Sequence, residues 1–260
     1  MAMGRLALVT RPRAQGEVWR RRLQALGVQA DLLPLIDIAP APDAPGLKRW
    51  AGTLAGGPPG PAALVMFVSP NAAQGLFDAL PAGWPWPDTT WAGATGPGTA
   101  AALRAAGVPE EAIVVPGADS AQFDSEALWA LLEPRRSWAG TRAAIVRGDG
   151  GRDWLADQLR AAGAHVEFVQ SYSRRPPQLG PQEARLLERA LAEPAEVAWL
   201  LSSSEAVDHL RALAPAASWA DSIALASHPR IAQSARQLGF GRVVDIRPTP
   251  QAVAEAMAGL

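Results

Sequence analysis

The chain has 260 residues, 48% of them hydrophobic and 19% charged, which is typical of a globular protein large enough for one large domain or two ordinary ones. Its formal net charge of −1 excludes a generally basic surface for nucleic acid or an anionic membrane, so an anionic ligand must be bound locally. The absence of cysteine excludes disulfides, thiolate chemistry and cysteine metal sites. No apolar run approaches the ~20 residues that cross a bilayer, and MAMGRLALVTRPR lacks a signal-peptide core, so we expect a cytoplasmic protein.

Short aliphatic runs recur along the chain, each followed by a turn of small polar residues and usually by an amphipathic helix. This order is typical of parallel α/β sheets. The ten strands that we expect lie near residues 6–10, 30–36, 62–68, 90–94, 112–115, 143–147, 165–170, 196–201, 222–226 and 242–246. Five strands per lobe fit a flavodoxin-like α/β arrangement with helices on both faces of each sheet.

The sequence repeats itself once. Residues 7–36 align with residues 143–172 at an offset of 136, which sets Arg11 against Arg147 and Gly27 against Gly163. Further pairs join 66–77 with 200–210 (Ser69 opposite Ser202), 95–108 with 227–240, and 123–132 with 248–257, where Ser125 and Thr249 are expected to cap helices. Such a repeat implies two duplicated lobes.

Two partitions of the chain agree with this repeat. Proline-rich segments follow residues 36 and 172, and crossings there give one discontinuous lobe, 1–36 plus 174–260, and one continuous lobe, 37–173. A simpler division near residue 136 needs no crossing. Periodicity alone does not choose between them.

Six turns with polar or glycine-rich chemistry each follow an expected strand and precede a helix. In a parallel sheet they lie at the carboxyl edges of the strands, where helix N-termini direct free N–H groups outward. If the lobes face one another, these turns line a cleft suited to carboxylates or phosphates. The alternative is ordinary helix capping at ~1 kcal/mol each. The candidate binding residues are Thr10, Arg11, Ser69, Asn71, Thr95, Gly96, Gly98, Arg147, Gly148, Ser202, Ser203, Ser204, Ser227 and Arg230.

Familiar signatures of other sites are missing from the sequence. There is no P-loop, and Gly96-Pro97-Gly98 lacks the third glycine of a dinucleotide-binding turn. The three histidines have no metal-ligand spacing, and Ser202–Ser204 form no nucleophile elbow. We therefore expect neither a P-loop nucleotide site, nor a dinucleotide site, nor a metal site.

The motifs VTRP at 9–12, FVSPNA at 67–72, GPGTA at 96–100, VRGDGGRDWL at 146–155, Tyr172, SSSEAV at 202–207, SHPRIA at 227–232 and TPQAV at 249–253 together resemble the uroporphyrinogen-III synthase family. The resemblance spans nearly the full chain, in order. It implies two flavodoxin-like lobes joined by a two-stranded connection, which favours the crossing partition.

The resemblance also implies a cofactor-free lyase (a hydro-lyase) of tetrapyrrole, or haem, biosynthesis. Its substrate would be hydroxymethylbilane, which carries eight carboxylates, and the enzyme would expel the terminal hydroxyl, invert ring D and close the macrocycle as uroporphyrinogen III. Tyr172 and Thr99 match family residues and are the candidate catalytic residues; apolar packing is the alternative role of Tyr172. Ser227-His228-Pro229-Arg230 departs from the family's turn, so Arg230 either contacts substrate or faces solvent. We expect a monomer in transient contact with hydroxymethylbilane synthase.

Two other functions agree with parts of the sequence. A non-catalytic bilobed protein that closes on a small anion would use the same turns without changing its ligand. A two-receiver signalling protein would need clustered acidic residues after the first strand, where this chain has Thr10 and Arg11.

Overall fold

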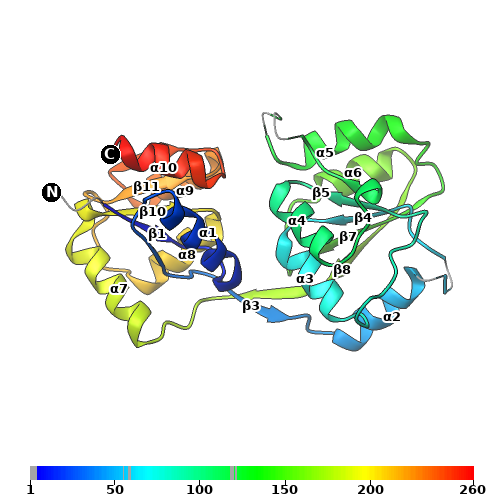
Figure 1. Ribbon diagram of the computed structural model, residues 1–260, viewed down its shortest axis with the longest axis horizontal. Coiled ribbons are helices and arrows are strands. Elements are labelled where there is room, and N and C mark those ends of the chain that lie inside the picture. The colour runs from blue at the N-terminus through cyan, green and yellow to red at the C-terminus, as the bar shows by residue number, and fades with distance from the viewer. Residues whose placement is uncertain (1–4, 55, 58–59, 118–119, 121) are drawn as a thin grey trace. The chain divides into compact units, whose positions relative to one another are not determined.

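The computed structural model describes residues 5–54, 56–57, 60–117, 120 and 122–260, so the first four residues of the N-terminal segment considered above lie outside the described residues. The chain divides into two compact units (Figure 1). Unit 1 contains the described residues up to Asp37 together with Arg175–Leu260, and unit 2 contains Ile38–Arg174. Unit 1 is therefore discontinuous in sequence.

Five parallel strands form the sheet of unit 1, in the order β12-β11-β10-β1-β2. Their bounds are β1 (Leu6–Val9), β2 (Ala30–Leu32), β10 (Val197–Leu201), β11 (Ile223–Ala226) and β12 (Arg242–Asp245). The central strand β10 is buried along its whole length, as its continuous apolar sequence VAWLL requires of a strand covered on both faces. In the register of the sheet, Leu8 of β1 lies opposite Trp199 of β10.

Unit 2 has a second parallel sheet, in the order β6-β5-β4-β7-β8. Its strands are β4 (Leu64–Phe67), β5 (Trp91–Ala94), β6 (Ile113–Val114), β7 (Arg142–Arg147) and β8 (His165–Gln170). All ten strands expected from the sequence are thus confirmed, with shifts of a few residues at their ends.

The two sheets share one topology. In unit 1, reading from edge strand β2, the strands follow the chain in the flavodoxin-like order 2-1-3-4-5. In unit 2, strands β8, β7, β4, β5 and β6 take the same places, but the chain enters at β4. Unit 2 is therefore a circular permutation of unit 1, and the expectation of two flavodoxin-like lobes is confirmed.

Helices cover both faces of each sheet. In unit 1, α1 (Arg13–Ala25) and α10 (Pro250–Ala258) pack on one face, and α7 (Pro181–Ala192), α8 (Ser204–Leu213) and α9 (Pro229–Leu238) on the other. In unit 2, α5 (Ser125–Leu132) and α6 (Trp154–Ala161) cover one face, and α2 (Ala44–Leu54), α3 (Pro70–Asp78) and α4 (Pro97–Ala105) the other. Short 3-10 turns are η1 (Glu110–Ala112), η2 (Glu133–Arg135) and η3 (Pro194–Glu196). None of the helices within the described residues is long and apolar enough to cross a membrane.

A separate two-stranded sheet pairs β3 (Asp37–Pro40) with β9 (Tyr172–Arg175). The chain passes from unit 1 to unit 2 within β3 and back to unit 1 within β9. The first residues of the two proline-rich segments therefore form paired strands, so the segments are not loops along their whole length.

Local sequence explains where the helices begin and end. Gly27 and Gly163 have φ of 80° and 90°, so these two glycines, which the repeat aligns, both follow their helices in the left-handed conformation. Two expected details are wrong. Asp124, and not Ser125, caps α5, because its carboxylate accepts from the Ala127 N–H. The N-cap equivalent to Ser69 is Ser203, one residue after the Ser202 that the sequence alignment placed opposite it.

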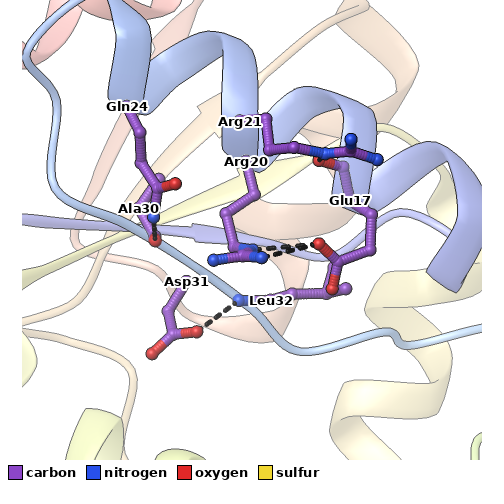
Figure 2. A network of polar contacts seen from close by, with 7 residues as sticks. All are labelled: Glu17, Arg20, Arg21, Gln24, Ala30, Asp31 and Leu32. Atoms are coloured by element: carbon purple, nitrogen blue, oxygen red, sulfur yellow. Dashed lines mark hydrogen bonds and ion pairs between the residues drawn. The ribbon is translucent and has the colours of Figure 1, made fainter.

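Polar contacts fix α1 to the edge of its sheet. Figure 2 shows the Gln24 side-chain amide donating to the Ala30 carbonyl at 3.1 Å and the Glu17 carboxylate accepting from Arg20. The Arg21 guanidinium donates to the Glu17 carbonyl in the same helix. Arg20 and Arg21 are therefore both engaged with their own helix.

Candidate active site

The topology of each sheet singles out one position at its carboxyl edge. In unit 1 the chain leaves β1 in one direction along the sheet and leaves β10 in the other, and β7 and β4 have the same relationship in unit 2. Ligands of open parallel sheets bind at such switch points. Four of the six polar turns lie there: 10–12 and 202–204 in unit 1, and 69–71 and 147–151 in unit 2. The turns 95–99 and 227–230 follow the neighbouring strands β5 and β11.

Tyr172, the single tyrosine of the chain, begins β9, and its side chain reaches the switch point of unit 2 at Ser69 and Gly148. Its side chain is buried in the core beside α3, and its phenol oxygen is 3.2 Å from the Ser69 hydroxyl. The Ser69 hydroxyl also accepts from the Ala72 N–H at 3.2 Å as the N-cap of α3. The neighbouring Ser171 donates to the Ala72 carbonyl at 3.0 Å. The start of β9 is thus attached to the first turn of α3.

Gly148 makes room for the tyrosine ring. A Cβ atom at this position would lie 2.9 Å from Cζ of Tyr172 and 3.3 Å from its phenol oxygen. A glycine in a binding turn can allow the backbone to approach a ligand closely. At Gly148 the group that approaches the backbone is instead the chain's own Tyr172.

The arginines around this turn are engaged within unit 2. Arg147 donates from Nη1 to Asp153 at 2.6 Å, and its guanidinium carbon lies 3.6 Å from the centroid of the Phe168 ring. Arg174 pairs with Asp149 through Nε at 3.5 Å. Arg147 therefore reaches this edge with its charge already balanced by an internal carboxylate.

The glycine turn of residues 95–99 opens α4. Gly96 is the N-cap, in extended conformation, and Pro97 occupies the first helical position. Thr99 is 4% exposed, while Thr95 is half-buried. A Cβ at Gly98 would lie 3.7 Å from Pro70, so this turn packs beside the start of α3. Asn71 follows Pro70 and is half-buried.

In unit 1 the Thr10 hydroxyl has a structural partner. It is 1% exposed and donates to the Leu200 carbonyl at 2.7 Å, which joins the ends of β1 and β10 across the switch point. Arg11 follows it and is half-buried, with its guanidinium carbon 4.2 Å from the centroid of the Trp19 ring. Burial lowers the pKa of Arg11 from the ordinary arginine value to about 10. Thr10 therefore holds the ends of β1 and β10 together, whereas Arg11 places a positive charge at this edge of the sheet.

The serines of unit 1 are differently placed. Ser202, Ser203 and Ser204 are all half-buried, and the N-cap Ser203 does not cap α8 through its hydroxyl. At α9 the N-cap is His228, whose Nδ1 accepts from the Arg230 N–H at 3.2 Å. Ser227 precedes it and is half-buried, and Arg230 is exposed.

Sequence reasoning missed two contributors to this chemistry. Asp153 balances Arg147, and its only signal was an acid six residues after an arginine in a glycine-rich turn. The ring of Trp19, on α1, stacks with Arg11, a contact that the sequence did not indicate. Among the described residues, no group of three His, Asp or Glu side chains is placed to hold a metal ion.

Comparison with known proteins gives one family. The family model described as uroporphyrinogen-III synthase HemD matches residues 17–255. A uroporphyrinogen-III synthase of Escherichia coli (strain K12) is 36% identical over 171 residues, and the alignment covers 64% of this chain and 64% of that relative, less than two thirds of its length. One from Proteus mirabilis is 30% identical over 170 residues, covering 64% of this chain and 79% of the relative.

Solved structures with the same fold cover nearly the whole chain. A mutant uroporphyrinogen III synthase of Thermus thermophilus is 22% identical with a TM-score of 0.57, covering 99% of this chain and 98% of that one. The Helicobacter pylori 26695 uroporphyrinogen-III synthetase is 14% identical, also with a TM-score of 0.57, and covers 99% of both chains. At these identities the likeness concerns the fold.

Proposed function

This chain belongs to the uroporphyrinogen-III synthase family, and we propose that it converts hydroxymethylbilane to uroporphyrinogen III with release of water. The observation that carries the proposal is the family match over residues 17–255 together with the polar turns at the switch point of each sheet. The reaction would pass through an azafulvene formed by loss of the terminal hydroxyl and a spiro-pyrrolenine that inverts ring D. No cofactor is needed for these steps.

Binding of the eight carboxylates is the first task of such an enzyme. The N-terminal N–H groups of α3, α4, α8 and α9, the half-buried hydroxyls of the turns and the Arg11 guanidinium are suited to it. A helix N-terminus contributes ~0.3–1 kcal/mol to an exposed anion and up to ~2 kcal/mol to a partly buried one. Several such contacts reach the ~8 kcal/mol of micromolar binding. We propose the candidate binding residues of the sequence for this role, with Thr10 and Gly148 acting through the structure that they support.

Catalysis in this proposal depends mainly on orientation. Holding the reacting carbons of a flexible bilane together has a ceiling of ~7–11 kcal/mol in well-oriented systems. Tyr172 would donate its phenol proton toward the departing hydroxyl, which leaves as water, and Ser69 would orient the phenol. Thr99, at the third position of α4, would hold a carboxylate beside this group.

The product isomer tests the proposal directly. Without an enzyme, hydroxymethylbilane closes uninverted to the type I isomer. Purified protein given freshly made hydroxymethylbilane should yield mainly type III, measured by chromatography of the oxidised porphyrins. Type I alone from folded protein would favour the alternative, a non-catalytic anion-binding protein.

The setting of the reaction follows from the chemistry of the substrate. Because hydroxymethylbilane closes spontaneously, we propose that the protein, as a monomer, receives it in transient contact with hydroxymethylbilane synthase. The absence of cysteine fits a reducing compartment, and we propose the cytoplasm.

A further inference from the structure

Arg11 is a charged group at the switch point of unit 1 for which the described residues provide no counter-ion. Its guanidinium stacks on Trp19, and its Nε atom is buried without a hydrogen-bond partner. Within the part of the chain that the structure describes, no carboxylate forms an ion pair with Arg11, and the residue is only half-buried, so solvent reaches it. A buried guanidinium Nε–H without an acceptor is costly for a folded protein.

In unit 2, the arginine at the equivalent position of the repeat binds a carboxylate. Arg147, the partner of Arg11 in the repeat, also stacks on an aromatic ring, that of Phe168. In unit 2 a carboxylate completes the arrangement, because Asp153 accepts from Arg147 at 2.6 Å. The three components in unit 2 are therefore an arginine, a ring and a carboxylate.

Unit 1 has a carboxylate at the matching position of the sequence, but it is engaged elsewhere. Glu17 matches Asp153 at the same offset of 136, and it accepts from Nε and Nη2 of Arg20 at 3.1 and 2.8 Å (Figure 2). Glu17 and Arg20 lie one turn apart on α1, so their ion pair is local to the helix. Unit 1 thus has the arginine and the ring without the carboxylate.

We propose that Arg11 and Trp19 form a carboxylate-binding site at the end of β1, and that a carboxylate of the substrate occupies the place that Asp153 fills in unit 2. The identity of this ligand rests on the proposed function. The planar guanidinium fork fits a carboxylate in two parallel hydrogen bonds, and the ring holds the fork in one plane.

Binding of a simple carboxylate tests the site without the reaction. Citrate is titrated into protein labelled with ¹⁵N-arginine, and the Arg11 Nε–H signal is assigned by its loss in Arg11→Lys. We expect this signal to shift with citrate and to stay unchanged with sodium chloride at equal ionic strength. An unchanged signal, or an equal shift with chloride, would overturn the proposal.

Kinetics test the ligand. Arg11→Gln should raise the KM for hydroxymethylbilane about tenfold to a hundredfold and leave kcat within about threefold, because a charged hydrogen bond to substrate is lost. Arg11→Lys should be intermediate, and Arg20→Gln, the matched control on α1, should equal the wild type. An unchanged KM in folded Arg11→Gln or Arg11→Lys would refute the substrate assignment. If the wild type forms no type III isomer, the proposed function fails, while the citrate titration still decides on the site.

Discussion

The Tyr172 phenol and the Ser69 hydroxyl share a hydrogen bond of 3.2 Å between residues 103 positions apart. Ser69 receives its orientation from α3, whose Ala72 N–H it caps, and Tyr172 receives its orientation from the core of unit 2. A phenol fixed on both sides at a switch point has a defined direction, which a proton donor needs.

Tyr172→Phe should lower kcat for type III formation by about tenfold to a hundredfold with little change in KM, because the ring is kept and only the phenol is lost. The measurement is steady-state kinetics with isomer analysis. Ser69→Ala should have a smaller effect in the same direction. If Tyr172→Phe turns over as the wild type does, the tyrosine serves packing alone.

Gly148→Ala should lower kcat by about tenfold, because its Cβ would meet Tyr172 at 2.9 Å and displace the ring from Ser69. Gly52→Ala is the matched control, since a Cβ there meets nothing within 4 Å. In a Tyr172→Ala background, Gly148→Ala should cause almost no further decrease in kcat, because the glycine acts through the tyrosine ring. Equal costs in both backgrounds would show that Gly148 acts independently of Tyr172.

Arg11→Met should stabilise the ligand-free protein at pH 7. Burial lowers the pKa of Arg11 from the ordinary arginine value to about 10, which costs at most roughly 3 kcal/mol of stability. The cation–π contact with Trp19 recovers only ~1 kcal/mol. Because the folded pKa is the lower one, the unfolded chain binds more protons between about pH 10 and the ordinary pKa of arginine, and the destabilisation applies fully below about pH 10.

The stability comparison is made by calorimetry. We expect Arg11→Met to raise Tm by several degrees, with a constant difference from about pH 6 to 9. Arg20→Met, which breaks the half-buried pair with Glu17, should lower Tm slightly or leave it unchanged. A lower Tm for Arg11→Met would mean that the guanidinium stabilises the fold.

The fold could be predicted from the sequence because its signals are local. Aliphatic runs, small polar turns and terminal glycines such as Gly27 are each read within a few residues, and the repeat doubles them. The partners of the polar groups are not local. The Thr10 hydroxyl bonds a carbonyl 190 residues away, and only the strand order β10-β1 brings the two together. The sequence therefore indicated the candidate turns. It did not indicate which of their polar groups form hydrogen bonds or ion pairs within the protein.

Glu183→Gln should lower the stability of the folded protein by an amount that depends on pH. The Glu183 carboxylate accepts from the Arg13 guanidinium and from the Gly180 N–H at 2.6 Å, and these contacts, the Arg13 hydrogen bond first, lower its pKa below 4.5. A depressed folded pKa gives stability that is present above about pH 4.5 and is lost as the pH falls through the folded pKa.

At pH 7, Glu183→Gln should lower the free energy of unfolding by about 1 kcal/mol, the usual contribution of a helix cap. This difference should become smaller as the pH is lowered. Denaturant titrations from about pH 7 down to about pH 3 measure it. Glu188→Gln, at an exposed position of the same helix, should show no such trend. A difference that stays constant throughout this acid range would contradict the assignment of this stability to the ionised carboxylate.

We propose that unit 2 is an independently folding domain, so residues 38–174 expressed alone should unfold cooperatively. This segment contains all five strands of the sheet β6-β5-β4-β7-β8 and the helices of both faces, so neither apolar face is left uncovered. A fragment ending at residue 136 should fail to fold, because it lacks β7 and β8. The edge of β4 that pairs with β7 would then be exposed, together with the buried side chains of Val65 and Phe67. Calorimetry and near-ultraviolet circular dichroism distinguish the two fragments. Cooperative unfolding of the shorter fragment, or a molten longer one, would show that the sheet is not the unit of folding.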